Sequence, residues 1–182
     1  MASPHTWAAL KVVAAAAITR PADTTQYASG DLVANSTVAA SVGAFIFSLG
    51  AQMTAQTFLL RKLRLRKSSN SVTSALFRMH FFTENPFASA PAGGDNQALV
   101  LAASNIGNYV GYIDVTVDKA IFNASDGTAG FGVPTEGAEL AIQMAASAST
   151  GFNLYGVLEA RAAYTPGNAE VFTATIEIYK DR

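Results

Sequence analysis

The sequence contains no cysteine, and this absence excludes two classes of stabilisation. Without thiols the chain forms neither disulfides nor thiolate metal sites, so its stability must come from packing and association. Histidine is also scarce. The two histidines, His5 and His80, do not cluster, which argues against a transition-metal site. We therefore expect no metal and no cofactor.

The chain is also poor in charge. Charged residues make up 14% of it, against roughly 25% in an average soluble domain, while 50% is apolar and the mean hydropathy is +0.24. Such a composition favours an oligomer whose contacts cover part of the surface, although abundant alanine alone would also raise the hydropathy. The net charge of −1 provides no overall field to attract nucleic acid. No segment reaches the ~18 consecutive apolar residues of a membrane helix.

Motifs that carry catalysis are missing as well. No serine stands in a Gly-x-Ser-x-Gly elbow, and the glycines between positions 127 and 137 are not followed by the Lys-Ser/Thr ending of a phosphate-binding loop. The stretch from Asn123 to Gly127 lacks the distal carboxylate of a calcium loop and is interpreted as an ordinary turn. His80 is interpreted as a polar-face strand residue. We predict that the chain is not an enzyme and has no catalytic residues.

The sequence does contain many short strand-like segments separated by turns. Their side chains alternate between apolar and polar, the two-residue period of a strand with one solvated face. Phe58, Leu59 and Leu60 break this alternation and suggest a β-bulge or a doubly covered region. The expected strands are Lys11 to Ile18 (where a helix is equally permitted), Leu32 to Asn35, part of Ser41 to Thr54, Gln56 to Lys67, Ala75 to Thr83, Tyr109 to Val117, Glu139 to Ala146, Phe152 to Tyr164 and Ala169 to Lys180.

These segments predict an all-β fold, an antiparallel β-sandwich or jelly roll with an extended N-terminal arm. We expect residues 1–30 to form the arm, the first strand and an ordered loop, and residues 31–182 to form the β-sandwich. The turn Thr165 to Asn168 predicts a hairpin between the last two strands. Glu84 to Asn96 is expected to be a long loop, a candidate arm or contact element, and Asn123 to Gly137 is expected to be loop-like.

One run of basic residues stands out from this weakly charged background. On a strand, Lys62, Arg64 and Arg66 would project to one side at ~6.6 Å spacing. Such a stripe is compatible with a solvated face that protects a sheet edge, with a protein interface, or with phosphate contacts, although aromatic residues do not interleave with it. The candidate partner-contact residues are Arg61, Lys62, Arg64, Arg66 and Lys67, together with Pro21 and Tyr27 of the segment described next.

A polar, turn-rich insert separates two apolar runs near the N-terminus. It reads Thr19-Arg20-Pro21-Ala22-Asp23-Thr24-Thr25-Gln26-Tyr27-Ala28-Ser29-Gly30-Asp31-Leu32. This insert resembles a signature of small virion proteins of tailed bacteriophages, usually grouped with the head. Further stretches resemble the same family and extend the similarity over most of the chain: Ala75 to Phe82 with Asn85-Pro86, Gly94-Asp95-Asn96 leading to Tyr109 to Asp114, and Leu158 to Pro166 with Glu170 and Phe172.

The resemblance implies a virion structural protein, of the decoration or cement type that binds the outside of a capsid. Such proteins commonly act as trimers that bridge neighbouring capsomers, so the implied partners are the major capsid protein and further copies of the chain. The implied location is the capsid surface, after synthesis in the bacterial host cytoplasm. No functional residue is transferred by this resemblance. The alternatives are a tail or connector subunit, or a carbohydrate-binding jelly-roll module of a phage fibre that uses Trp7, Tyr109, Tyr112 and Tyr155.

Overall fold

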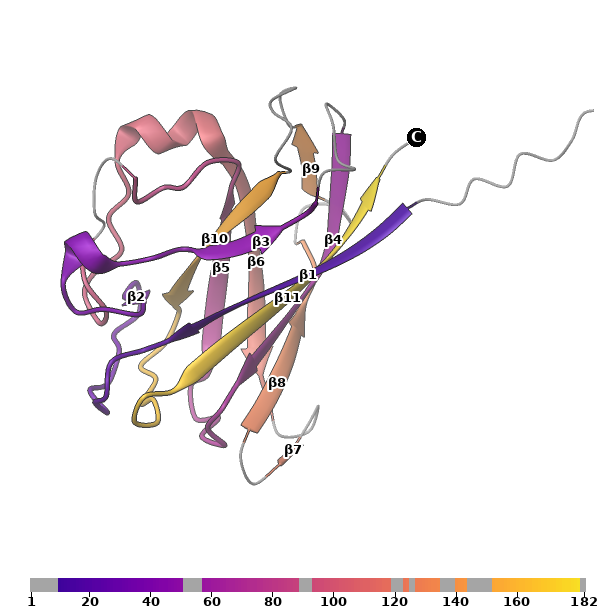
Figure 1. Ribbon diagram of the computed structural model, residues 1–182. Coiled ribbons are helices and arrows are strands. Elements are labelled where there is room, and N and C mark those ends of the chain that lie inside the picture. The colour runs from indigo at the N-terminus through magenta and orange to yellow at the C-terminus, as the bar shows by residue number, and fades with distance from the viewer. Residues whose placement is uncertain are drawn as a thin grey trace, which may run out of the picture.

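The computed structural model describes residues 10–50, 57–88, 93–118, 123–124, 127–134, 140–143 and 152–180. The part of the predicted arm before residue 10, with His5 and Trp7, lies outside these residues. The regular secondary structure of the described chain is almost entirely β-strand (Figure 1). They are β1 (Leu10–Thr19), β2 (Leu32–Val33), β3 (Phe45–Ser48), β4 (Thr57–Lys67), β5 (Leu76–Phe82), β6 (Tyr109–Val117), β7 (Asn123–Ala124), β8 (Gly127–Gly132), β9 (Leu140–Gln143), β10 (Asn153–Ala160) and β11 (Val171–Lys180), with the short 3-10 helices η1 (Ala39–Ser41) and η2 (Ala103–Asn108).

The strands form a jelly roll. Hydrogen bonds connect them in the order β1-β11-β4-β8-β6-β5-β10-β2, while β3 extends the β2 side of β10 and β9 extends the β8 side of β4. Counting β2 with β3 and β8 with β9, and setting aside the two-residue β7, leaves eight strand positions. The first pairs with the eighth, the second with the seventh, the third with the sixth and the fourth with the fifth. All these pairs are antiparallel, as in a long hairpin rolled up into two sheets.

The two sheets enclose the main hydrophobic core. The first sheet contains β1, β11, β4 and β8, and the second contains β6, β5, β10 and β2. Alternation decides which side chains enter the core. In β4, Leu63 and Leu65 are fully buried, while Arg64 and Arg66 are exposed. Strands β1 and β3 pack against each other where the two ends of the strand order meet.

The predicted hairpin between the last two strands is wrong. β10 pairs with β5, β2 and β3 in the second sheet, whereas β11 pairs with β1 and β4 in the first. The seventh and eighth strands of a jelly roll belong to different sheets. The turn around Gly167 therefore carries the chain from one sheet to the other instead of reversing it within one.

The glycine-rich segment between residues 123 and 137 is not simply a loop, as the sequence suggested. It contains β7 and β8, although residues 125–126 and 135–137 lie outside the described part. The glycines are needed because β8 passes very close to β6. A Cβ atom at Gly130 would collide with the carbonyl oxygen of Thr116, and one at Gly132 with that of Asp114. This close approach joins the two sheets through the pairing of β6 with β8.

Other expectations are confirmed. β1 is a strand along its whole length, and the ambiguous segment from Ser41 to Thr54 contains β3. The bulge predicted in β4 lies at Arg61, since Glu177 faces Lys62 whereas Ile178 faces Leu60, which leaves Arg61 without an opposite residue in β11.

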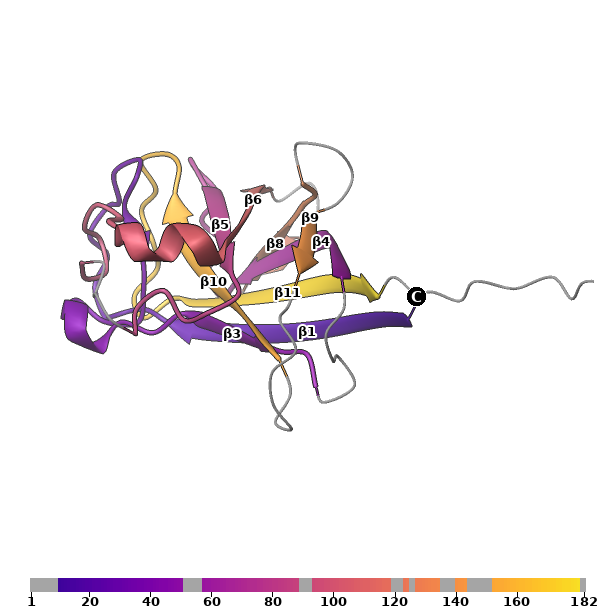
Figure 2. The same ribbon diagram turned by 90° about the horizontal axis from the view of Figure 1, so that it is seen from above.

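The two sheets differ in how their outer faces are covered. On the second sheet, chain between β5 and β6 packs against Phe82 and Val157 and forms a smaller core with Leu32, Ala34, Val42, Phe87, Leu99, Leu101 and Tyr155. Figure 2 shows η2 lying outside β5 and β10. On the first sheet nothing comparable happens among the described residues: every second residue of β1 from Lys11 to Thr19 is exposed. Within residues 10–30, β1 belongs to the first sheet, and Ala14, Ile18 and Tyr27 belong to the main core.

Candidate functional site

Two side chains of the N-terminal insert, Arg20 and Tyr27, lie in a buried polar cluster. Arg20 Nη2 donates to Asp95 Oδ2 at 2.9 Å, and Arg20 Nε donates to the Tyr27 hydroxyl at 2.8 Å. That hydroxyl in turn donates to Asp95 Oδ1 at 2.7 Å, which also accepts from the backbone N–H of Ala34. All three side chains are buried, and burial together with the neighbouring Asp95 carboxylate raises the pKa of Tyr27. The prediction of Tyr27 as a partner contact is therefore wrong, because its side chain is enclosed by its own chain.

A second buried ion pair lies beside the first cluster. Lys67 Nζ donates to Glu170 Oε1 at 3.1 Å and to the carbonyl of Ser69 at 2.9 Å. The Tyr164 hydroxyl donates to Glu170 Oε2 at 2.6 Å. Lys67 is fully buried, so its prediction as a partner contact is also wrong: alternation turns it inward with Leu63 and Leu65, and Glu170 compensates its charge.

Stacked tyrosine rings connect the two clusters. The rings of Tyr27 and Tyr164 are 6.3 Å apart and nearly parallel, and the N–H of Tyr27 donates to the carbonyl of Tyr164 at 2.9 Å. Three of the stretches that resemble phage virion proteins thus meet here. The N-terminal insert contributes Arg20 and Tyr27, the stretch from Gly94 contributes Asp95, and the stretch near the C-terminus contributes Tyr164 and Glu170. Their polar residues hold loops together at one end of the jelly roll. Pro21 lies in the same loop and is only partly buried.

The basic stripe lies on the uncovered outer face of the first sheet. Arg64 and Arg66 are exposed and Lys62 is half-buried beside them. Arg64 donates to the Thr175 hydroxyl at 3.3 Å, and the Lys62 ammonium lies 4.5 Å from the centre of the Phe131 ring. None of the three forms an ion pair with a carboxylate among the described residues; Glu177, the acid facing Lys62, pairs instead with Lys11 at 3.1 Å. β4 lies between two neighbouring strands, so edge protection does not explain the stripe.

Small and apolar side chains surround these cations. Ala15 and Ala17 on β1 lie opposite Thr175 and Thr173 on β11, which in turn face Arg64 and Arg66. Val13 and Phe131 are 57% and 45% exposed on the same face, and they flank a shallow depression of about 200 Å3 together with Lys62, Arg64, Thr175 and Glu177. We call this surface the bare face: the outer side of β1, β11, β4 and β8. Arg61 packs over the Tyr179 ring at 4.6 Å.

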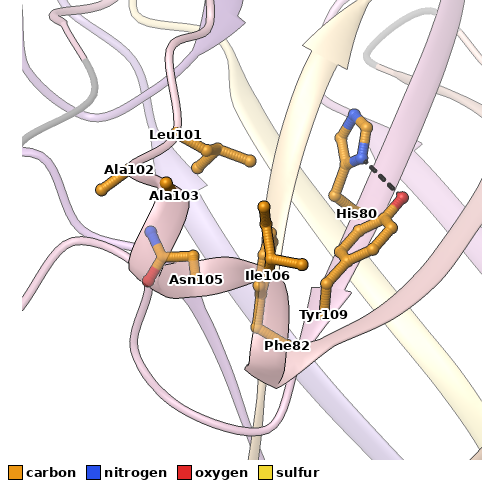
Figure 3. A pocket seen from close by; sticks show the side chains of 8 residues that line it. All are labelled: His80, Phe82, Leu101, Ala102, Ala103, Asn105, Ile106 and Tyr109. Carbon is orange, nitrogen blue, oxygen red and sulfur yellow. Dashed lines mark hydrogen bonds between the residues drawn. The ribbon is translucent and has the colours of Figure 1, made fainter.

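A pocket of about 480 Å3 opens on the opposite side of the sandwich (Figure 3). Strands β5 and β6 supply one wall with His80, Phe82 and Tyr109, and the segment around η2 supplies the other with Leu101, Ala102, Ala103, Asn105 and Ile106. Apolar atoms make up most of the lining. Tyr109 and Ile106 are 41% and 76% exposed at its margin. We call this site the η2 pocket; the sequence showed Tyr109 and His80 but gave no sign that η2 would face them.

A chain of polar contacts runs from the η2 pocket across the second sheet. His80 Nδ1 is 3.1 Å from the Tyr109 hydroxyl, and His80 Nε2 is 2.8 Å from Glu159 Oε2. Arg161 binds the other oxygen of Glu159 at 2.8 Å. Burial lowers the pKa of His80 despite the opposing effect of Glu159. The imidazole therefore favours its neutral form, with its hydrogen on Nε2 because a carboxylate can only accept.

Neighbouring charged groups are engaged with one another. Arg78 binds Asp114 through two hydrogen bonds of 2.7 and 2.9 Å and lies 3.7 Å over the Tyr112 ring. The hydrogen bonds and the positive charge of Arg78 lower the pKa of Asp114. Among the described residues, no group of three histidine, cysteine or acidic side chains is placed to hold a metal ion. Within the same residues, no helix is long and apolar enough to cross a membrane.

Comparison with known proteins gives only distant similarities. No protein-family model matches the sequence, and no curated protein matches it. Among solved structures, the chain is similar to the cyanophage Pam1 capsid at 9% identity, covering 98% of this chain and 91% of that chain with a TM-score of 0.33. The chain is also similar to turnip yellow mosaic virus at 9% identity, covering 99% of this chain and 85% of that chain with a TM-score of 0.26. A legume lectin-like domain from Entamoeba histolytica is similar at 9% identity, with 88% of this chain and 98% of that chain covered and a TM-score of 0.29. At such TM-scores these similarities carry no argument about function.

Proposed function

We propose that the chain is a structural protein of a virion, of the decoration type, and that it works by adhesion and not by catalysis. The bare face is the observation that carries this proposal. Its cations lack carboxylate partners among the described residues, and exposed Val13 and Phe131 lie beside them. Complementary charge across an interface speeds association and selects the partner, so this face fits an acidic protein surface.

The shape of the bare face suits a protein partner better than nucleic acid. Its alanines and threonines are small side chains opposite one another on β1 and β11, which permits the backbone of a protein partner to approach the sheet closely. Single-stranded nucleic acid would require several exposed aromatic rings for base stacking. Phe131 is the exposed ring near the stripe, and Lys62 already lies over it. We therefore take the partner to be the capsid protein that the sequence resemblance implies.

The mechanism of such a protein is mechanical. A packed genome pushes the shell outward, and a protein that bridges capsomers adds buried surface that must be exposed again before the shell opens. At ~25 cal/mol per Å2 of apolar area, even a modest contact is favourable, and repetition over the lattice multiplies it. The two buried ion pairs suit this role because they hold the loops at one end of the jelly roll in fixed positions.

A carbohydrate-binding role is the second candidate, and exposed Tyr109 at the η2 pocket favours it. The other aromatic residues considered for that role are less available. Tyr112 lies under Arg78, and Tyr155 packs into the smaller core of the second sheet. Trp7 lies outside the described residues. We rank the glycan role below adhesion to a capsid because one exposed ring offers little stacking surface.

Mass spectrometry of gradient-purified virions from the phage that encodes the chain tests the proposal. We expect the chain in stoichiometric amounts relative to the capsid protein. We also expect the purified chain to bind heads that lack it, in cosedimentation that weakens as salt rises. Absence from purified virions would refute the structural role, and presence only in the tail fraction would refute the decoration role.

A further inference from the structure

The chemistry of the η2 pocket restricts what it can bind. Apart from His80, Asn105 and Tyr109, its lining is hydrocarbon. Asn105 Nδ2 already donates to the carbonyl of Pro86 at 2.9 Å. A sugar would bring several hydroxyls against this lining without partners, and each buried hydroxyl without a hydrogen bond weakens binding. The pocket therefore fits a large, mostly apolar ring better than a saccharide.

The polar groups of the pocket wall offer one clear hydrogen-bonding role. Glu159 holds the hydrogen of His80 on Nε2, so His80 Nδ1 accepts from the Tyr109 hydroxyl. The Tyr109 hydroxyl oxygen then has free lone pairs at the pocket margin and acts as an acceptor. A matching ligand is an apolar ring with a single donor. The indole of tryptophan has this pattern, since its Nε1–H donates and nothing in it accepts.

The chain contains one tryptophan, Trp7, three residues before β1. Three residues span at most about 11 Å, and this length limits how far from Leu10 the segment that carries Trp7 reaches. Figures 1 and 2 both place η2 on the opposite side of the molecule from that start. β1 itself is ten residues, or ~33 Å, long. A three-residue connection from the start of β1 is too short to reach the pocket of the same chain, so a neighbouring copy is the donor that this length allows.

We propose that the η2 pocket receives the Trp7 indole of a second copy of the chain, with the indole N–H donating to the Tyr109 hydroxyl. The contact is head-to-tail, so each copy donates one segment and accepts another. Such contacts close into rings when the rotation between copies permits it. This inference rests on the proposed function and adds self-association to it, because a ring of copies is a natural bridge between capsomers. Tryptophan in a pocket is a typical anchor of protein interfaces.

Sedimentation and tryptophan fluorescence of the purified full chain test this inference together. Trp7 is the single tryptophan, so its emission reports directly on the contact. We expect an oligomer whose emission is shifted to shorter wavelength relative to free indole in water. Trp7→Ala should abolish the oligomer. Ile106→Glu should abolish it and return the emission to the solvent value, and Tyr109→Phe should weaken self-association about threefold to tenfold.

Val38→Glu is the matched control for Ile106→Glu. Both residues are exposed, at 60% and 76%, but Val38 lies beside η1, away from the pocket lining. It should leave both the oligomer and the emission unchanged. Mixing Trp7→Ala with Ile106→Glu gives a sharper control, because the first retains an intact pocket and the second an intact tryptophan. The mixture should form a one-to-one heterodimer with shifted emission, which excludes misfolding as the cause of the single defects.

The inference is overturned if the wild-type chain sediments as a monomer, if the oligomer persists in Trp7→Ala, or if Ile106→Glu leaves the emission unchanged. None of these results affects the detection of the chain in purified virions. A chain present in virions but monomeric in solution would refute the tryptophan contact alone. A chain absent from virions that still forms the tryptophan-dependent oligomer would refute the proposed function alone.

Discussion

Residues that look like surface markers in the sequence form the polar interior of this protein. Arg20 and Asp95 are 75 positions apart, and Lys67 and Glu170 are 103 apart, yet each pair is fully buried. Buried ions cost several kcal/mol each to desolvate, and this cost is offset only when both partners and their hydrogen bonds are in place. The pairs therefore depend on the complete set of loops around them.

Removing one partner of the Lys67–Glu170 pair should be strongly destabilising. Glu170→Leu leaves a buried ammonium without its carboxylate, and we expect a loss of about 3–5 kcal/mol in the free energy of unfolding. Chemical denaturation with urea measures it. The double variant Lys67→Met/Glu170→Leu leaves no uncompensated charge and should be more stable than Glu170→Leu alone. A double variant as unstable as the sum of both single variants would contradict this account.

His80 should make stability depend on pH. Burial lowers its pKa below the ordinary value of 6.5, so between the folded pKa and 6.5 the unfolded chain binds more protons than the folded chain. The free energy of unfolding must then rise with pH through this window, by at most about 1.4 kcal/mol per pH unit. The charged and titratable groups facing the ring are Glu159, Arg161, Arg78, Tyr109 and Tyr112.

Thermal unfolding at pH 5 and pH 7.5 checks this dependence. The wild-type chain should lose more stability at pH 5 than His80→Asn, whose side chain does not titrate. His5 is present in both chains and cancels in the comparison. Equal losses in the two chains would show that the charge on His80 does not matter to folding.

At the scale of elements, the glycines of β8 permit the two sheets to join. Gly130→Ala would place a methyl group against the Thr116 carbonyl, and backbone at a strand pairing cannot move aside easily. We expect a loss of about 2–3 kcal/mol in the free energy of unfolding. Gly107→Ala is the control, because a Cβ there meets no atom within 4 Å and the residue lies in η2. If both substitutions had the same small effect, β8 would not require its glycines.

The elements that could be predicted from sequence are those with strict alternation. β6 has the predicted bounds, and the inward residues of β11, and of β4 after its bulge, follow the two-residue period. β8 was missed because glycine gives no alternation signal and resembles a turn. The pairing of β10 and β11 was predicted wrongly because local turn chemistry indicates a reversal but not the sheet to which the next strand belongs. In the basic stripe, alternation placed Arg64 and Arg66 correctly, but the partner that buries Lys67 lies 103 residues away.

At the scale of the whole molecule, the two outer faces of the jelly roll differ in what covers them. The second sheet is covered by its own chain, whereas the outer side of the first carries cations that have no carboxylate partner among the described residues. Lys62→Glu/Arg64→Glu/Arg66→Glu should fold with little change in stability, since surface substitutions usually matter within about 0.5 kcal/mol. Its binding to heads, measured by cosedimentation, should fall at least tenfold.

A charge-conserving variant separates charge from shape in that experiment. Lys62→Arg/Arg64→Lys/Arg66→Lys keeps all three cations and should bind heads nearly as well as the wild-type chain. If the charge-reversed variant bound heads undiminished, the stripe would be merely solvated. If both variants lost binding equally, the side chains would act through shape instead of charge.

Electron cryomicroscopy of the intact virion tests the central claim most directly. We predict jelly-roll density on the outside of the shell, with β1, β11, β4 and β8 turned toward a neighbouring protein and acidic side chains opposite Lys62, Arg64 and Arg66. A reconstruction in which this sheet faces open solvent, or in which the chain has no place in the particle, would contradict the account.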